Sequence, residues 1–432
     1  MAMSIDRRGF LGIAGIAGAS LLLAGCVGQA APAPSAPGVS LGPAAADATG
    51  NISYWNHFTG EDERRGFEAV TKGFAEAYPG LKLKEESIPN ADFMTKFTTA
   101  AQAGSLPDSV MVHANRVQDM VGMNGLVDLS SAMDSWSGAS DIEEKLLTPF
   151  RRDGALYAIP CTMFVDWFYY RADWLEELGY FEPPKTWQEF REVAKAMTSG
   201  DRYGVALRGG AGGGEPVIKM IRGYNGPLTD ADGAPTLDLE ATKTALEEYS
   251  ALYLVDKSAP PSAPADGYNQ IFQSFLNGQT GMLMHHTGSL KSVTDVLKTG
   301  EQVLTAPMPT TPVDTTGWLQ PMGNGIASPD NASSALSWVE YWGSADPQVE
   351  LFSATGYFPS ATSGQQSPTI AEDPIMSAAN EQVKDGVTPE YFNGMTGWQD
   401  NSVLVQFQSL LVGETTLDKA AQAIVDDFNK NF

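Results

Sequence analysis

The chain has 432 residues, 43% of them hydrophobic, which is enough for two domains of ordinary size. Its 27 Lys and Arg residues face 52 Asp and Glu residues, so the formal net charge is −25 at pH 7. A surface this acidic argues against nucleic acid and anionic lipid headgroups as partners, and it weakens the case for a phosphorylated ligand unless a local basic pocket overrides the overall charge.

Residues 1–25 have the features of an export signal. Arg7 and Arg8 precede Gly-Phe-Leu, which is typical of twin-arginine (Tat) signal peptides. The uncharged run from Phe10 to Ala24 is too short for a membrane-spanning helix, which needs about 20 apolar residues. It ends in Leu-Ala-Gly-Cys26, which resembles a bacterial lipobox, whose cysteine thiol carries a diacylglyceryl group. The alternative is an ordinary signal peptide that happens to contain a cysteine.

The segment 26–49 is predicted to be a lipidated cysteine followed by a flexible tether. After Cys26 it is rich in Ala, Pro, Gly and Ser, with a single charge at Asp47, so it cannot bury enough apolar surface to offset ordering entropy. No later segment approaches 18 uncharged apolar residues. We therefore expect an extracytoplasmic protein, periplasmic or on the cell surface, that is anchored to the membrane by lipid on Cys26.

The chain contains two cysteines, and the lipobox accounts for one of them. Cys161 is then left without a disulfide partner, and we expect it to be a small buried residue and not a nucleophile. Stability must come from a large core instead of covalent cross-links.

The pattern of elements predicts an α/β fold. In the first part of the body, strands and helices alternate, with strands at 52–58, 81–85 and 109–113 and helices at 60–78 and 92–103. This alternation indicates a parallel sheet flanked by helices.

The second part of the body is also predicted to contain both strands and helices. A capping box, Thr186 with Glu189, marks the start of one helix. The other expected elements are a hairpin-like piece at 154–160, strands at 163–170, 204–208 and 280–286, a glycine-rich loop at 209–214, and helices from 172 and at 240–256, 269–277 and 415–432.

Several short passages resemble those of maltose-binding-protein-like extracellular solute-binding proteins, which serve ABC-type sugar importers. They occur in the family's order and are spread over nearly the whole chain after the tether. They lie at residues 103–108 (AGSLPD), 125–129 (GLVDL), 170–179 (YRADWLEELG), 183–190 (PPKTWQEF), 230–237 (DADGAPTL), 275–282 (FLNGQTGM) and 356–359 (GYFP). One departure is that His285-His286-Thr287 stands where many relatives carry a stacking tryptophan, so maltodextrin specificity is not implied.

The resemblance implies a two-lobe periplasmic-binding-protein fold of type II, in which each lobe is a mostly parallel sheet flanked by helices and crossing strands form the hinge. Lobe one would hold 48–162 and 318–355, and lobe two 163–317 and 356–432. A sugar or oligosaccharide would be captured between the lobes and delivered to an ABC permease by a monomer without cofactor. The resemblance also places ligand contacts in loops at the carboxyl ends of strands, as in open α/β sheets generally.

Candidate ligand contacts are aromatic side chains that stack on sugar rings and polar side chains that satisfy hydroxyls. For each of them a core or surface role is the alternative, and for Asp166 it is a structural ion pair, because a buried carboxylate needs a partner. The candidates are Trp55, Asn56, His57, His113, Asn115, Arg116, Asp166, Arg208, Trp318, Asn324 and Trp398. Trp338 and Trp342 have helical spacing and are expected in the core.

No catalytic or metal motif is found. The loop 209–214 lacks the Lys-Ser/Thr of a phosphate loop, and Asp230-Ala-Asp-Gly lacks the later ligands of a calcium loop. His285 and His286 are adjacent in a strand, so we expect them on opposite faces and unable to share a metal. The chain is therefore predicted to be a binding protein and not an enzyme. The alternatives are a receptor for a polyol or another polar sugar derivative and, more remotely, an exported lipoprotein glycosidase, which needs two carboxylates about 5–10 Å apart in one cleft.

Mature protein purified from native membranes should carry lipid on Cys26, because the lipobox precedes it directly. Mass spectrometry of the N-terminal peptide tests this expectation. An unmodified Cys26, or cleavage at another position, would contradict it.

Overall fold

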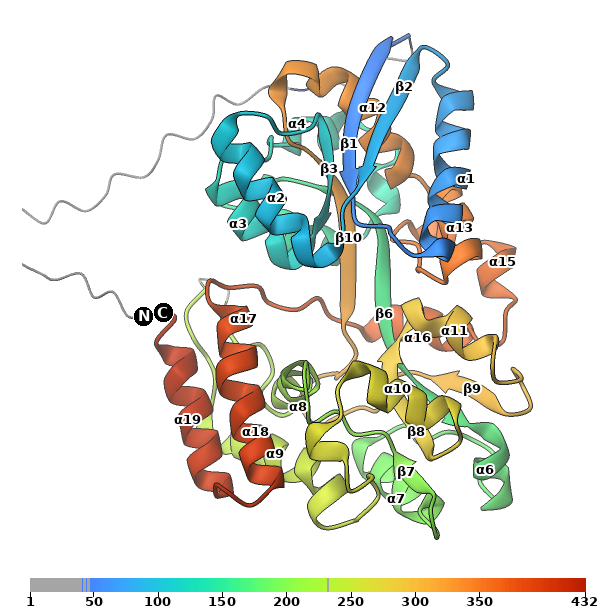
Figure 1. Cartoon of the computed structure of the whole chain (residues 1–432), viewed down its shortest axis with the longest axis vertical. Coiled ribbons are helices and arrows are strands. Elements are labelled where there is room, and N and C mark those ends of the chain that lie inside the picture. The colour runs from blue at the N-terminus through green and yellow to red at the C-terminus, as the bar shows by residue number, and fades with distance from the viewer. Residues whose placement is uncertain (1–40, 42–43, 45–46, 231–232) are drawn as a thin grey trace, which may run out of the picture. The chain divides into compact units, whose positions relative to one another are not determined.

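The computed structural model describes residues 41, 44, 47–230 and 233–432, so the expected signal peptide, Cys26 and most of the expected tether lie outside the described residues (Figure 1). None of the helices in the described part is long and apolar enough to cross a membrane. The strands are β1 (Gly50–Asn56), β2 (Leu81–Ser87), β3 (Ser109–His113), β4 (Arg151–Arg152), β5 (Ala155–Leu156), β6 (Ile159–Arg171), β7 (Tyr203–Val205), β8 (Thr280–His286), β9 (Val303–Ala306) and β10 (Leu319–Ile326).

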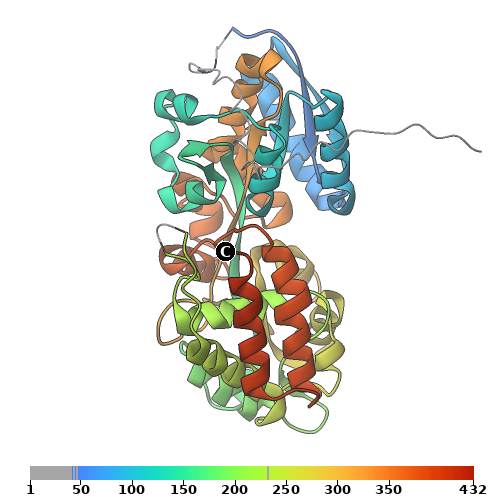
Figure 2. The same ribbon diagram turned by 90° about the vertical axis from the view of Figure 1, so that its left-hand side faces the viewer.

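The helices cover both faces of the sheet (Figures 1 and 2). They are α1 (Glu61–Ala77), α2 (Asn90–Ala103), α3 (Val117–Gly122), α4 (Ser130–Ser135), α5 (Glu144–Leu147), α6 (Ala172–Glu177), α7 (Trp187–Met197), α8 (Gly214–Asn225), α9 (Leu239–Leu254), α10 (Tyr268–Leu276), α11 (Leu290–Thr294), α12 (Ala332–Gly343), α13 (Ala345–Thr355), α14 (Thr362–Gln365), α15 (Pro368–Ala371), α16 (Ser377–Asp385), α17 (Met395–Trp398), α18 (Leu404–Leu411) and α19 (Leu417–Asn429).

One mixed sheet runs through the body in the order β2-β1-β3-β10-β6-β8-β7, with β9 added beside β6. The pairs β1–β2, β1–β3 and β7–β8 are parallel, as the alternation of strands and helices predicts. The strands in the middle, β6 and β10, pair antiparallel with their neighbours. Figure 1 shows that β6 and β10 run between the two halves of the body.

The long strand β6 belongs to both halves. Its residues 159–165 pair with β10, and from Asp166 onward it pairs with β8, where Asp166 lies opposite His286. At the changeover the Asp166 N–H donates to the Trp318 carbonyl at 3.0 Å. The run 163–170 was expected as a strand, and it is longer at both ends because the crossing strand serves two sheet segments in succession.

The apolar side chains form two separate cores, and the first of them also extends along β6 to residues of the other half, such as Phe275, Leu283 and Val303. The first centres on Trp338 and Trp342, both fully buried as expected, with the ring of Tyr54 at 5.2 Å from that of Trp338. The second includes Trp187 and Tyr249, and α18 and α19 pack side by side over α9 there (Figure 2). The two lobes are the two halves that Figure 1 shows on either side of the crossing strands, while the lobe boundaries stay predictions.

Several local expectations are confirmed. Thr186 Oγ1 accepts from the Glu189 N–H at 3.2 Å and Glu189 accepts from the Thr186 N–H, so the capping box begins α7. Cys161 is a free, buried thiol, and burial raises its pKa well above the usual range.

The expected strand 204–208 is shorter, since only Tyr203–Val205 pair fully with β8. Leu41, in the expected tether, is 6% exposed and packs in the first core.

Trp338→Ala should lower the free energy of unfolding by about 3–5 kcal/mol, because it removes a fully buried aromatic side chain and leaves a cavity. Urea unfolding followed by circular dichroism measures the change. Phe181→Ala is the matched control, since Phe181 is 85% exposed and its loss should leave the midpoint almost unchanged. Equal effects of the two substitutions would contradict the assignment of Trp338 to the core.

Candidate ligand-binding site

A cavity of about 330 Å³ lies where the crossing strand β6 meets β8 and the start of α8. His113 enters it from the end of β3, Arg208 from the segment after β7, and His286 from the end of β8. These are carboxyl ends of strands that have a parallel partner, which is where open α/β sheets bind ligands. The cavity therefore draws on both halves of the sheet.

A buried cation between two carboxylates forms the polar centre of the cavity. Lys219 Nζ lies 2.5 Å from Asp166 Oδ2 and 2.6 Å from Glu215 Oε1. The Trp318 N–H donates to Asp166 Oδ2 at 3.0 Å, and the Gln320 amide donates to both carboxylates at 3.3 Å. Of the two roles considered for Asp166, the structure provides the ion pair, and Asp166 also lines the cavity.

The pKa values of this centre reflect a competition between burial and pairing. Burial raises the pKa of Asp166 to about 6, because desolvation outweighs the attraction of Lys219. Burial also acts to raise the pKa of Glu215, but Lys219 outweighs it, and the net shift is downward. For Lys219, burial acts to lower the pKa, and the two carboxylates overcome it and raise the pKa. The ammonium is therefore held in its charged form.

The four histidines of the chain lie in two pairs, and three of them, His113, His285 and His286, line the cavity. His57 and His113 have ring nitrogens 3.2 Å apart, and the rings of His285 and His286 have centroids 4.4 Å apart. The expectation that His285 and His286 lie on opposite faces is wrong, because His286 is the last residue of β8 and both rings line the cavity. Burial lowers the pKa of His57 to about 3 and that of His286 to about 4, so both are neutral at pH 7.

The tautomer of His286 follows from its hydrogen bond. The Gly288 N–H donates to His286 Nδ1 at 3.1 Å, so Nδ1 is an acceptor and the proton of the neutral ring resides on Nε2. His286 thus offers one N–H donor at the wall of the cavity.

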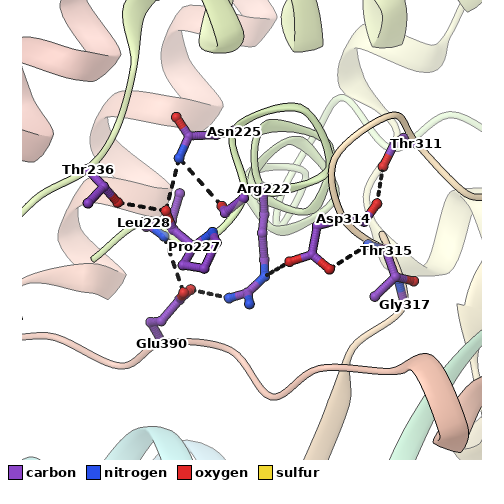
Figure 3. Close-up of polar contacts among 11 residues, drawn as sticks. Arg222, Asn225, Pro227, Leu228, Thr236, Thr311, Asp314, Thr315, Gly317 and Glu390 are labelled. Atoms are coloured by element: carbon purple, nitrogen blue, oxygen red, sulfur yellow. Dashed lines mark hydrogen bonds and ion pairs between the residues drawn. The ribbon is translucent and has the colours of Figure 1, made fainter. Parts of the chain in front are cut away.

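One face of α8 holds the cavity and the crossing segments together. Glu215, Lys219 and Arg222 follow one another at helical spacing, so they share a face. Arg222, one turn beyond Lys219, lies 3.2 Å from Asp314 and 2.5 Å from Glu390 (Figure 3). Asp314 belongs to the loop that leads into β10, and Glu390 to the segment between α16 and α17. α8 thereby ties both connections to the second lobe.

Three of the eleven sequence candidates, His113, Asp166 and Arg208, line the cavity. Trp318 lies beside it, with Lys219 Nζ 5.0 Å from its ring centroid. The Arg208 side chain is half-buried, and its Nε donates to the Ala211 carbonyl at 2.8 Å. These four residues come from β6, from the segment before β10 and from the ends of β3 and β7, which lie far apart in sequence.

The other seven candidates lie outside the cavity lining. Asn56 accepts from the Phe58 N–H, Arg116 donates to Asn90, and the Lys96 ammonium lies over the ring of Trp55. Two are held inside cores: Asn324 accepts from the Tyr54 hydroxyl at 2.6 Å, and Trp398 Nε1 donates to the Ile424 carbonyl at 2.9 Å.

The remaining two of these seven are His57, which is buried against His113, and Asn115, which lines a second hollow formed with residues 391–397.

A sequence model of the bacterial extracellular solute-binding protein family matches residues 60–349. The chain belongs to this family. The match includes most of the passages on which the sequence resemblance rests, and it contains the strands β2, β3, β6, β8 and β10.

Individual relatives of this solute-binding protein are distant. A putative binding protein of Brucella abortus is 25% identical over 222 residues, or 50% of this chain and 53% of that protein, so the chain spans about half the length of the curated relatives it matches. The GacH receptor of Streptomyces glaucescens, solved unliganded and with acarbose, has a TM-score of 0.76 at 22% identity over 89% of this chain and 98% of its own. The sugar-binding protein MalE of Xanthomonas citri has a TM-score of 0.79 at 19% identity over 88% and 97%. These structures share the two-lobe fold.

Sequence analysis missed several cavity residues of this solute-binding protein. Glu215 and Lys219 are separated by four positions at the start of a helix that follows a glycine-rich loop, and that spacing was a usable signal. Tyr268 and Gln320 carry no such signal, because only folding brings α10 and β10 to the cavity.

A larger hollow of about 760 Å³ lies beside α7, away from the crossing strands. Arg191 in its wall is paired, since it contacts Glu248 at 2.7 Å and Asp256 at 2.8 Å. We place the ligand site in the smaller cavity, which has strand ends and unpaired donors. Within the described residues no group of three or more His, Cys, Asp or Glu side chains could hold a metal ion.

Lys219→Met should destabilise the protein by about 3–5 kcal/mol at pH 7, because it leaves two carboxylates in the cavity wall without their cation. The folded-state pKa of Asp166, already raised to about 6 by burial, should then rise further, and that of Glu215 should rise above its unfolded value. The folded variant binds protons that the unfolded chain does not, so its deficit should shrink as the pH falls from 7 toward 4.5. Urea unfolding at both pH values measures this.

The matched control is Lys185→Met, which removes the cation of an exposed pair with Glu182, both side chains being 73% exposed. Its unfolding midpoint should stay unchanged at both pH values. A deficit of Lys219→Met that does not depend on pH would contradict the role of Lys219 as counter-ion.

Proposed function

We propose that this chain is the substrate-binding component of an ABC importer, which captures a sugar or oligosaccharide between its two lobes and delivers it to the permease. The observation that carries the proposal is the cavity at the crossing strands, lined from one half by His113 and from the other by Arg208 and His286. Membership of the solute-binding family supports it. The ligand contacts that we retain are His113, Asp166 and Arg208.

The chemistry of the cavity suits a polyhydroxylated ligand. Phe164 and Tyr268 offer aromatic faces for C–H groups, and Gln320, Lys219 and the imidazoles offer polar atoms for hydroxyls. A volume of about 330 Å³ is at the small end of the range for ligand pockets, which favours a small sugar over a long oligosaccharide. A polyol or another polar sugar derivative is the alternative ligand.

The remote alternative of a glycosidase requires two free carboxyl groups. Asp166 and Glu215 are close to each other, but both bind the same ammonium of Lys219. Neither is therefore set up as a proton donor or nucleophile. We propose binding without catalysis, so a bound oligosaccharide should be recovered intact after incubation.

The lipid anchor on Cys26 and Tat export belong to the same proposal. A binding protein must stay near its permease, and a lipid with a flexible tether keeps it at the outer face of the membrane. We propose that the mature protein is an extracytoplasmic monomer anchored in this way.

A thermal-shift panel of mono- and oligosaccharides and polyols should contain a ligand that raises the melting temperature. At a hundredfold excess over the dissociation constant, the ligand adds about 2.7 kcal/mol to stability. Because a ligand that touches both lobes favours the closed state, small-angle scattering should detect a smaller radius of gyration at saturation.

His113→Ala and Asp166→Asn should weaken the binding of the ligand found, while Phe181→Ala, far out on the surface, should not. If no sugar or polyol in the panel shifts the melting temperature, the proposed ligand class is wrong. Binding without compaction would contradict closure of the lobes.

A further inference from the structure

Arg208 is a cation at the cavity wall without a carboxylate partner. The four other arginines of 163–317, Arg171, Arg191, Arg202 and Arg222, each have a carboxylate oxygen within 3.3 Å. Arg208 forms no such pair with any described residue: its Nε donates to a backbone carbonyl and its guanidinium carbon lies 5.6 Å from the ring centroid of Tyr268. Its two terminal nitrogens are left for another acceptor.

The glycine-rich loop provides room for this guanidinium. A Cβ at Gly212 would lie 1.9 Å from Arg208 Nη2, so only glycine allows the side chain to pack there. Gly212 also has a φ of 78°, in the left-handed region that favours glycine. The loop 209–214, which lacks a phosphate-loop motif, thus has a specific task, which is to hold the Arg208 fork in place.

Both carboxylates of the cavity bind Lys219, and neither forms an ion pair with Arg208. Asp166 already accepts from Lys219, the Trp318 N–H and Gln320. Glu215 Oε1 accepts from Lys219 and Gln320. The unused donors at this end of the cavity are the terminal nitrogens of Arg208 and the Nε2–H of His286.

Both donors line the same cavity. The Arg208 guanidinium lies over Tyr268, the Tyr268 ring centroid is 4.9 Å from that of His285, and His285 adjoins His286. A carboxylate or phosphate matches the planar fork of arginine with two parallel hydrogen bonds, which a single hydroxyl cannot provide.

We propose that the ligand of this cavity carries an anionic group, a carboxylate or a phosphate, which binds to the Arg208 fork with His286 as a further donor. The inference rests on the proposed binding function and narrows its ligand class to acidic sugars and sugar phosphates. An overall charge of −25 gives the protein no general attraction for anions, so recognition depends on this local pair of donors.

Matched ligand pairs test the proposal by calorimetric titration of the intact mature protein. Glucuronate with glucose and galacturonate with galactose differ by a carboxylate in place of a hydroxymethyl group, and glucose 6-phosphate adds a phosphate to glucose. At least one acidic member should bind at least tenfold more tightly than its neutral parent. The affinity for the acidic member should decrease as the NaCl concentration is raised from 50 to 500 mM, while the affinity for the neutral parent should stay constant. Preference for the uronates or for the phosphate identifies which anion is bound.

Arg208→Gln should reduce the affinity for the preferred acid by about tenfold to 100-fold and leave that for the neutral parent within about threefold, since a charge-assisted pair is lost. Arg208→Lys, which retains the charge without the fork, should recover part of the preference. Arg202→Gln is the control, because Arg202 is exposed and pairs with Glu177 on the surface.

Equal binding of acid and neutral parent by the wild type would overturn the inference and leave the proposed function standing. Equal loss of both ligands in a folded Arg208→Gln variant would overturn it as well, because Arg208 would then serve hydroxyls. If neither these sugars nor any member of the thermal-shift panel binds, the proposed function fails together with the inference.

Discussion

The ion pair between Asp166 and Lys219 is the interaction on which the arrangement of this protein depends. Asp166 lies on the crossing strand at the residue where pairing changes from β10 to β8, so it occupies the junction of the two lobes. A buried carboxylate there is costly unless a cation and hydrogen-bond donors compensate it. Lys219, the Trp318 N–H and Gln320 supply them, and together they draw α8, β10 and the preceding segment onto β6.

The same helix links the site to the hinge. Lys219 and Glu215 face the cavity from the first turns of α8, and Arg222 binds Asp314 and Glu390 from its last turn. Asp314 lies in the segment that leads into β10, and Glu390 in the segment that follows α16, so α8 holds both connections. A ligand that alters the hydrogen bonds of Lys219 would therefore act on the helix that also anchors these two connections.

Because Lys219 binds the carboxylates of Asp166 and Glu215, these two side chains are less available to a ligand. In many polar sites carboxylates bind the hydroxyls of the ligand, but here protein donors already occupy the oxygens of Asp166. At this end of the cavity, the donors without an acceptor among the described residues are the terminal nitrogens of Arg208 and the Nε2–H of His286. Arg208 is charged, whereas His286 is neutral because burial lowers the pKa of its imidazole. This arrangement of donors is the basis for the anionic ligand proposed above.

The amino-acid sequence by itself determined the local structure and the family. The capping box at Thr186, the parallel strands near the start of the body and the buried Cys161, Trp338 and Trp342 all follow from patterns within a few residues, where propensity and periodicity act. The ordered passages were enough to recognise the solute-binding family.

Only the tertiary structure decided which polar residues share a cavity. His113, Asp166 and Arg208 come together there, whereas Asn324 and Trp398 turn into cores, because a strand or helix presents each side chain to whatever element packs against it. The adjacent His285 and His286 illustrate this: the alternation of a strand predicts opposite faces, but the strand ends at His286 and both rings line one cavity. Contacts between segments distant in sequence, such as Lys219 with Asp166, depend on how the lobes pack and leave no local pattern from which they could be predicted.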